Sequence, residues 1–414
     1  MKNKQLVLMG VAFALVAGVY FLSTGEDDEP QMIIGQEPLS DLPVGEIQSI
    51  QITSISESDD GVVETLILTR SKHGWIVGNG RNYPADTDRI ERFVKEFTEM
   101  KVLRQVSAST SQLGRIHLLD PAKGATNAAA QITLLGEDSK AIYTLHLGKE
   151  ISGPSDPSAN TSIFGGGNFP DRRFVMINGN RETIAVVDQT FSNATPTPSD
   201  WLNKDFFKIE NPNSIAVTYA GTESTNSWRI AKEDVNGTEE WVLAGAKKDE
   251  KLDTTAAPTS PFSSPSFNDI ADKQQAASLD ANATKIEVGT SDGLHYIFTV
   301  SQKDADDDYT LKMDVNASFP EKRTPAADEK PEDKEKLDKD WTEAQAKLKT
   351  KLEAEKKFTN WSFQVEGYTV EPLLKKRGEL LAEKDSGAIQ PPSGGTTPLP
   401  PFKNLPPFQP NQDK

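Results

Sequence analysis

The sequence predicts an α+β protein in which two related, mostly antiparallel sheet domains, each with a packing helix, follow one N-terminal transmembrane helix. Three observations lead to this fold class. The chain opens with a long uncharged apolar run, its remainder is rich in short β-type patterns, and those patterns return in the same order about 160 residues later. With 414 residues, the chain has room for two or three domains.

Composition excludes several classes of function. Acidic residues number 62 and basic residues 45, so the net charge is −17, which argues against nucleic acid as a partner because phosphate binding needs a basic face. Cysteine is absent, which excludes disulfides, thiolate metal sites and a cysteine nucleophile. The four histidines are too far apart for a local metal motif. They are His73, His117, His146 and His295.

The N-terminal apolar run predicts a membrane anchor. Lys2 and Lys4 precede it, and no charge occurs from Gln5 to Gly25. At about 1.5 Å per residue, this run just crosses a hydrocarbon core of roughly 30 Å. The acidic residues 26–29 follow, so we expect a cytoplasmic N-terminus and a periplasmic bulk. The residues expected to contact the lipid bilayer are Leu6, Val11, Phe13, Leu15, Val19 and Leu22.

A cleaved secretory signal is the alternative for the same run. It needs small residues at the end of the apolar stretch, whereas Ala12 and Ala14 lie in its middle. We therefore favour a retained single-pass anchor in the cell membrane. Both interpretations export residues 26–414.

Patterning divides the exported part into segments. The expected domains are a 1–25 anchor, a 26–45 spacer, a first α+β repeat at 46–195, a second at 196–327, a charged amphipathic helix with a strand and a terminal helix at 328–385, and a Pro-rich tail at 386–414. In the first repeat, strand patterns lead to a helix that Asp86 or Asp88 can cap, with Glu91 placed for a capping box. Its apolar face is Ile90, Phe93, Val94, Phe97 and Met100.

Two nearly constant offsets predict an internal duplication. The matching pairs are Ile50 with Ile215, Ile52 with Val217, Trp75 with Trp241, Ile132 with Ile286, and Tyr143 with Tyr296. The offsets are 165 or 166 in the first three pairs and 154 or 153 in the last two, and the change falls near the Pro/Ser-rich residues 256–266. Residues 45–190 and 210–320 should then share one strand order. Chance alignment of β-patterns is the alternative.

The segments around the second repeat carry the remaining apolar residues. We expect four residues to pack at the junction of the repeats, namely Trp201, Leu202, Phe206 and Phe207. A charged helix over 328–357 has a narrow apolar stripe that we expect to pack on its own sheet rather than on a partner. The stripe is Leu337, Trp341, Ala344, Leu348 and Leu352. A strand at 361–365 and a helix at 370–384 follow. The tail is either a docking peptide presenting Phe402 and Phe408 or a solvated end.

Motifs for chemistry are absent from the sequence, so we expect no catalytic residue, no cofactor and no metal. It contains no P-loop, no dinucleotide-binding Gly motif, no serine elbow and no His-Glu-x-x-His. The acidic residues 304–308 offer oxygen ligands, but the Gly and the distal Glu of a calcium loop are missing, and a charged hairpin loop is the simpler interpretation. The Gly-rich loop ending in Arg172 and Arg173 is either an anion contact or a plain connection.

Several residues together resemble the family called domain of unknown function 4340. The features are the anchor, the Ile-x-Ile strand at 50–52, Gly74-Trp75 before Tyr83–Asp86, His117–Pro121, Leu147-Gly148 and Asp200–Pro212. The resemblance would cover about residues 45–380. One departure is Gly114–Leu119, which stands where the family usually has Tyr-Gly-Leu. The resemblance implies a bacterial envelope protein with one membrane span, often encoded beside gliding-type ABC exporter components, and supplies no catalytic residues.

These observations lead to one expected function and two alternatives. We expect a non-enzymatic, membrane-anchored extracytoplasmic accessory protein of an envelope complex, whose partner is an ABC exporter permease or another envelope protein. A structural or ligand-binding envelope protein without a transporter partner is the first alternative. A hydrolase with an unrecognised site is the second.

Topology is directly testable. A reporter enzyme fused after residue 40 should be active if it requires export from the cytoplasm and inactive if it requires the cytoplasm. The full chain should remain in the membrane fraction after a carbonate wash. Both results follow from an uncleaved apolar span with positive charge on its cytoplasmic side. Release of a shorter soluble chain would instead identify the run as a cleaved signal.

Overall fold

The computed structural model describes residues 31–56, 61–125, 127–152, 170–279, 282–305, 307–325 and 329–382. In these ranges, none of the helices has the length and apolar character that a membrane span requires. The expected anchor residues and the Pro-rich tail lie outside the described residues. The anchor residues concerned are Leu6, Val11, Phe13, Leu15, Val19 and Leu22.

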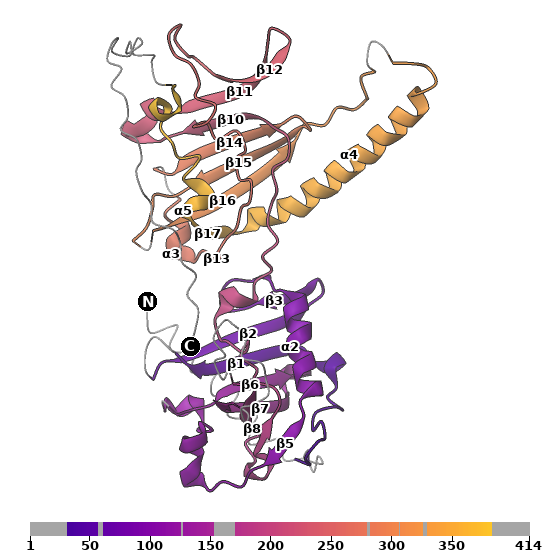
Figure 1. Ribbon diagram of the computed structural model, residues 1–414, viewed down its shortest axis with the longest axis vertical. Coiled ribbons are helices and arrows are strands. Elements are labelled where there is room, and N and C mark those ends of the chain that lie inside the picture. Colours follow the sequence, from indigo (N-terminus) through magenta and orange to yellow (C-terminus); the bar gives the residue numbers. More distant parts are fainter. Residues whose placement is uncertain are drawn as a thin grey trace, which may run out of the picture.

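The first sheet forms the lower half of the molecule in Figure 1. Its strand order is β4-β3-β2-β1-β6-β7-β8-β9-β5, with antiparallel neighbours throughout. The strands are β1 (Ser49–Ile55), β2 (Val63–Ser71), β3 (Gly74–Val77), β4 (Tyr83–Pro84), β5 (Val102–Gln105), β6 (Ala130–Leu135), β7 (Ala141–Ile151), β8 (Arg172–Ile177) and β9 (Ala185–Val187). On β1, Ile50 and Ile52 are fully buried while Gln51 between them is half-buried, as period-two alternation requires.

One helix, α2 (Thr87–Glu99), covers the buried face of the first sheet. Asp86 is its N-cap and accepts a hydrogen bond from the backbone N–H of Arg89, so the predicted cap is confirmed. The predicted apolar face is also buried. It comprises Ile90, Phe93, Val94 and Phe97, followed by Met100.

The second sheet forms the upper half of the molecule in Figure 1. Its strand order is β12-β11-β10-β14-β15-β16-β17-β13, again antiparallel. The strands are β10 (Pro212–Thr218), β11 (Trp228–Val235), β12 (Thr238–Leu243), β13 (Asp269–Ile270), β14 (Thr284–Thr290), β15 (Leu294–Val300), β16 (Asp308–Ala317) and β17 (Ser362–Glu366). The helices of this half are α3 (Lys273–Ala276), α4 (Lys334–Lys356) and α5 (Gly367–Val370).

The two sheets share one strand order. Apart from β4, the first sheet reads β3-β2-β1-β6-β7-β8-β9-β5, which matches the second strand for strand. The registers agree as well: Ile50 pairs with Leu68 and Leu134, as Ile215 pairs with Ile230 and Val288. Trp75 lies opposite Arg70 on β2, and Trp241 lies opposite Lys232 on β11, so the two indoles occupy equivalent positions. The expected agreement in strand order is thus confirmed and supports an internal repeat, while the domain boundaries stay predictions.

The second unit lacks a counterpart of α2 between β12 and β13, and the helix that packs on its sheet is instead α4. Between β12 and β13 runs an irregular segment whose prolines, at positions 258, 261 and 265, remove backbone donors and oppose a helix. This segment and residues 367–382 cover the sheet together. Lys375 Nζ donates to Ala256 O at 2.7 Å, and Leu252 forms a bridge with Leu381.

The predicted helix at 370–384 is mostly wrong. Over the described residues 367–382, the structure has only α5 and one 3-10 turn, Arg377–Leu380. The carbonyl groups of Leu374 and Lys375 accept hydrogen bonds from side chains of the sheet instead of from a next helical turn. Their donors are Tyr219 Oη, at 2.5 Å from Leu374 O, and Trp228 Nε1, at 2.6 Å from Lys375 O.

An aromatic cluster joins the two units, and one continuous hydrophobic core runs through both. Tyr83 on β4 has ring contacts with Phe267, Trp361 and Phe363 of the second unit. At the rim, the guanidinium of Arg81 forms a two-point ion pair with the Asp269 carboxylate, and Trp361 Nε1 donates to Arg81 O. We call these residues, together with the linker aromatics Phe206 and Phe207, the junction cluster.

The linker residues divide between the units. Phe206 contacts Phe267, Phe358 and Phe363, whereas Phe207 contacts Phe262 and Phe298. Trp201 instead packs on Phe93 of α2, beneath the Arg89 guanidinium at 4.6 Å. Leu202 forms a bridge with Ala85 of the first unit.

The junction cluster should carry much of the stability of the whole chain. Replacing the fully buried Phe363 by Ala should lower the free energy of unfolding by about 3–5 kcal/mol, because it removes a ring and leaves a cavity between the units. Thermal unfolding of the full chain measures this. The partly exposed Ile67→Ala on the open sheet face serves as the control and should cost far less. Equal costs for both variants would contradict a stabilising role of the junction.

Candidate functional site

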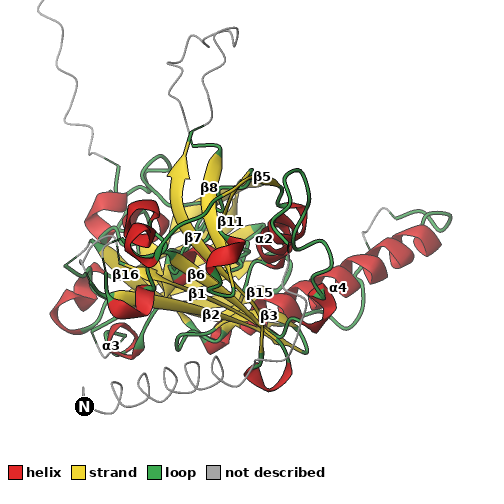
Figure 2. Ribbon diagram, turned by 90° about the horizontal axis from the view of Figure 1, so that it is seen from below, coloured by secondary structure: helices red, strands yellow, loops and turns green. Residues whose placement is uncertain are grey.

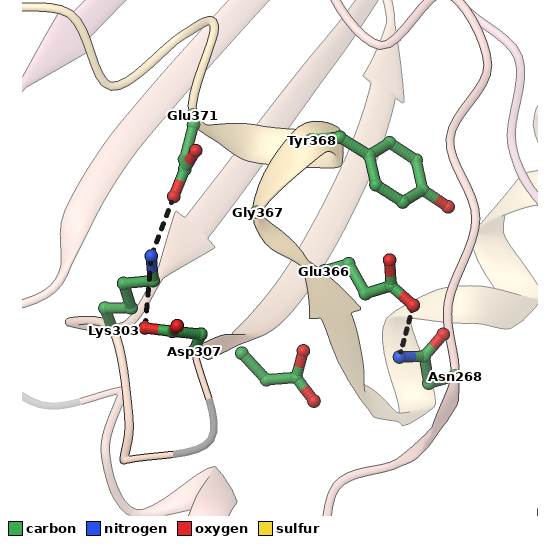
Figure 3. A pocket seen from close by; sticks show the side chains of 8 residues that line it. Asn268, Lys303, Asp307, Glu366, Gly367, Tyr368 and Glu371 are labelled. Carbon is green, nitrogen blue, oxygen red and sulfur yellow. Dashed lines mark hydrogen bonds and ion pairs between the residues drawn. The ribbon is translucent and has the colours of Figure 1, made fainter.

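A hollow of the second unit lies between the β15–β16 turn and the start of α5 (Figure 3). Its volume is about 510 Å³. The lining residues are Asn268, Lys303, Asp307, Asp308, Glu366, Gly367, Tyr368 and Glu371. Four carboxyl groups against one ammonium make it acidic, and Tyr368 presents its ring with 60% of its surface exposed.

An ion-paired lysine lines one side of this hollow. Lys303 Nζ lies 3.2 Å from Glu371 Oε1 and 3.2 Å from Asp307 Oδ1, and these contacts raise the pKa of the ammonium. The turn is internally bonded as well, because Asp304 Oδ1 accepts from the backbone N–H of Asp308 at 2.9 Å. Among the described residues of the acidic run, Asp304 and Asp307 lie in the β15–β16 hairpin loop and Asp308 begins β16, as the simpler interpretation predicts. The described part of the chain contains no group of three or more potential ligands converging on a metal position.

A second, more apolar groove lies beside α2 in the first unit. Its volume is about 400 Å³. It is lined by Val44, Gly45, Ile47, Arg70, Trp75, Ile90, Glu91, Val94, Lys95 and Thr98. The Arg70 guanidinium at its rim donates to Gly45 O at 3.3 Å. The groove offers aliphatic and indole surface bordered by the charged side chains of Arg70, Glu91 and Lys95.

The four histidines lie on separate elements and do not form a catalytic pair. His73 is exposed in the β2–β3 turn, His117 ends a 3-10 turn in a left-handed conformation, and His295 is half-buried on β15. His146 on β7 is 7% exposed, and its Nδ1 has no hydrogen-bond partner among the described residues. Burial lowers the pKa of His146, so the ring is neutral in the folded chain at pH 7.

Two of the segments that carry the family resemblance, His117–Pro121 and Leu147-Gly148, lie near His146. A second, small hydrophobic cluster lies there, formed by Leu118, Ala129, Met176 and Ile184. Asp120 starts a turn by accepting from the N–H of Ala122, with Pro121 in the first turn position. Gly148 is required beneath it, because a Cβ at that position would lie 2.5 Å from Ile116 O. The motif at 117–121 therefore contributes to packing of this cluster.

Arg173 is also a structural residue. Its guanidinium donates to Gly148 O, Glu150 Oε1 and Thr190 O, at 2.8, 3.1 and 2.7 Å. Burial lowers its pKa. Arg172 Nε lies 3.4 Å from Asp171 Oδ1. Residues 153–169 of the Gly-rich loop lie outside the described residues. The possible anion contact at Arg173 is thus replaced by internal bonds.

Helix α4 is the most prominent projection of the second unit (Figures 1 and 2). Only its C-terminal half packs on the core, through Leu348 and Leu352, which confirms the expected packing for this part of the stripe. All of residues 331–340 are exposed, including Leu337 at 39%. The predicted stripe therefore extends beyond the sheet that it covers.

A buried carboxylate fixes α4 in place, and sequence reasoning missed it. Glu355 is 6% exposed and accepts from the backbone N–H of Lys208 at 3.0 Å and from Tyr296 Oη at 2.7 Å. The sequence did contain one indication that Glu355 is buried: it follows Leu352 by three residues and so lies on the apolar stripe of the helix. The acidic hollow was missed because Lys303, Glu366 and Glu371 meet only in the folded chain.

The buried His146 predicts a pH dependence of stability. Because its pKa is below the usual value near 6.5 in the folded chain, the unfolded chain binds the proton more readily, and stability falls as the pH drops below about 6.5. His146→Gln should lose this slope, which amounts to at most about 1.4 kcal/mol per pH unit. Unfolding midpoints of both chains between pH 8 and 5 test this. Parallel curves over the whole range would show that His146 does not contribute.

Comparison with known proteins gives one match. The family model described as domain of unknown function (DUF4340) matches residues 75–281, from β3 of the first unit to the approach to β14. None of the curated proteins matches the chain, and none of the solved structures does. The match covers half of the chain, so the protein belongs to the DUF4340 family.

Proposed function

We propose that this protein is a non-enzymatic, membrane-anchored accessory protein of an envelope complex, with its two sheet units outside the cytoplasm. The partner in this proposal is an ABC-type exporter, as the family resemblance implies. The apolar run between Gln5 and Gly25 supplies the anchor in this proposal, because it is the one uncharged stretch long enough to span the hydrocarbon core.

The observation that carries the proposal is the engagement of the reactive side chains in internal bonds. Lys303 is paired with two carboxylates, Arg173 is bonded to three oxygens, and Glu355 holds α4. The parts of the chain that a partner can reach are the open faces and edges of the two sheets and the exposed half of α4. Such surfaces suit binding of proteins rather than turnover of a substrate. An anchor also raises the effective concentration of these surfaces near a membrane partner.

A structural or ligand-binding envelope protein without a transporter partner is the second candidate. The groove beside Trp75 favours it, because this groove presents apolar surface that a ligand can cover. A hydrolase has less support: its general base would have to be one of four histidines, and the one that is buried, His146, has no bonded nucleophile among the described residues.

Crosslinking in intact membranes distinguishes the candidates. An ABC ATPase and a multi-span permease should be recovered with the full chain, and an exported chain without residues 1–25 should lose both, because it no longer stays at the membrane. Recovery of the chain without either component would support the second candidate. Single His→Gln substitutions at positions 73, 117, 146 and 295 provide the control and should leave recovery and cellular function intact. Loss of function in one such variant that still folds would favour an enzyme.

A further inference from the structure

The outer edge of β12 is unpaired among the described residues. β12 is the last strand of the second sheet and pairs only with β11. In the first sheet, the equivalent strand β3 is covered by β4, which pairs Ile76 with Pro84 and Val77 with Tyr83. The same edge of the same fold is thus extended by a strand in one unit and open in the other.

The register shows which backbone groups of β12 point away from the sheet. A two-residue turn, Asn236-Gly237 with positive φ at both positions, joins β11 to β12. Beyond the strand, Ala244 N donates to Arg229 O, the residue directly opposite in register. Because bonded and non-bonded pairs alternate in an antiparallel ladder, the N–H and C=O groups of Glu239 and Trp241 face outward.

Like charges lie opposite each other along this hairpin. Glu240 pairs with Glu233, and Glu239 pairs with Asp234, so two carboxylate pairs face one another across the strands. Asp234 Oδ1 also accepts from the turn N–H of Gly237, and the ammonium of Lys232 lies over the ring of Trp241. Glu233, Asp234, Glu239 and Glu240 are all exposed.

This charge selects the kind of strand that can pair with the edge. Two copies of β12 side by side would place acidic side chains against acidic side chains, which opposes pairing with a second copy through the same edge. A strand with basic side chains meets the opposite condition on both faces of the hairpin. The acidic edge therefore repels a second copy of itself and attracts a positively charged strand.

We infer that the edge of β12 binds an extended segment rich in lysine or arginine by strand addition. The outward N–H and C=O groups of Glu239 and Trp241 supply the backbone bonds, and the hairpin carboxylates supply the preference for positive charge. In the first unit, the equivalent edge of β3 is paired with β4, which places Tyr83 against Trp361 of the second unit. The inference concerns this edge alone and is independent of any transporter.

The test uses the full chain in a neutral detergent and a synthetic peptide of about ten residues with alternating lysine and valine. The same peptide, N-methylated on every backbone nitrogen, keeps its charge but has no backbone donors. The unmodified peptide should bind at least about tenfold more tightly by fluorescence anisotropy, because several strand hydrogen bonds are lost in the control. Its binding should also weaken with added salt.

Variants at Glu239 locate the binding edge. Glu239→Pro removes an N–H that points away from β11, so the hairpin keeps its ladder while peptide affinity falls about tenfold or more. Glu239→Gln keeps the N–H and should cost only about two- to fivefold, the effect of one exposed charge. Amide hydrogen exchange provides a readout that does not depend on any variant: the amides of Glu239 and Trp241 should be protected only when peptide is bound.

Three results would overturn the inference. Equal affinity for the methylated peptide would reduce binding to general attraction by an acidic chain. Unchanged amide exchange at Glu239 and Trp241 in the presence of bound peptide would place the peptide elsewhere. Self-association of the full chain that Glu239→Pro abolishes would make a second copy the occupant.

Discussion

The aromatic contact between β4 and β17 determines how the rest of the molecule is arranged. The ring of Tyr83 lies against those of Trp361 and Phe363. The edge strand β4 of the first sheet therefore packs close to β17, which lies next to the edge of the second sheet. Rings of this size bury large apolar areas, and their edge-to-face geometry adds specificity to the contact. The ion pair between Arg81 and Asp269 closes the rim. Two similar sheets thereby become one body with a single core.

Within this body, the residues typical of the family have structural tasks. The turn at Asp120 and Pro121 caps a small cluster over β7 and β8, Gly148 lets that cap approach the sheet, and Trp201 packs against α2. Membership in the family is therefore recognisable from packing residues. The family match itself names no function. In our proposal, binding falls to parts such as α4 and the sheet edges.

Much of the fold was predictable because the determining signals are local. Alternation at Ile50 and Ile52 and the cap at Asp86 depend on near neighbours in sequence, and the repeated offsets give the shared strand order. The absent counterpart of α2 was not predictable from the repeat itself, because the prolines at 258, 261 and 265 override the inherited pattern. The predicted helix at 370–384 was wrong because tertiary bonds, such as that from Trp228 to Lys375 O, hold the chain in another conformation. The hollow around Lys303 depends on contacts with Glu371, 68 positions away along the chain, which periodicity does not report.

The position of α4 affects the order in which the chain can assemble. In the first unit, 7 residues (178–184) join β8 to β9, whereas 44 residues (318–361) separate β16 from β17. Closing the longer loop costs about 1.6 kcal/mol more chain entropy on a logarithmic scale. The first sheet can complete itself from neighbouring segments, but the second waits for residues 362–366, which also carry Phe363 of the junction cluster. The contacts of Tyr83 with Trp361 and Phe363 therefore form only when nearly all of the described residues are present.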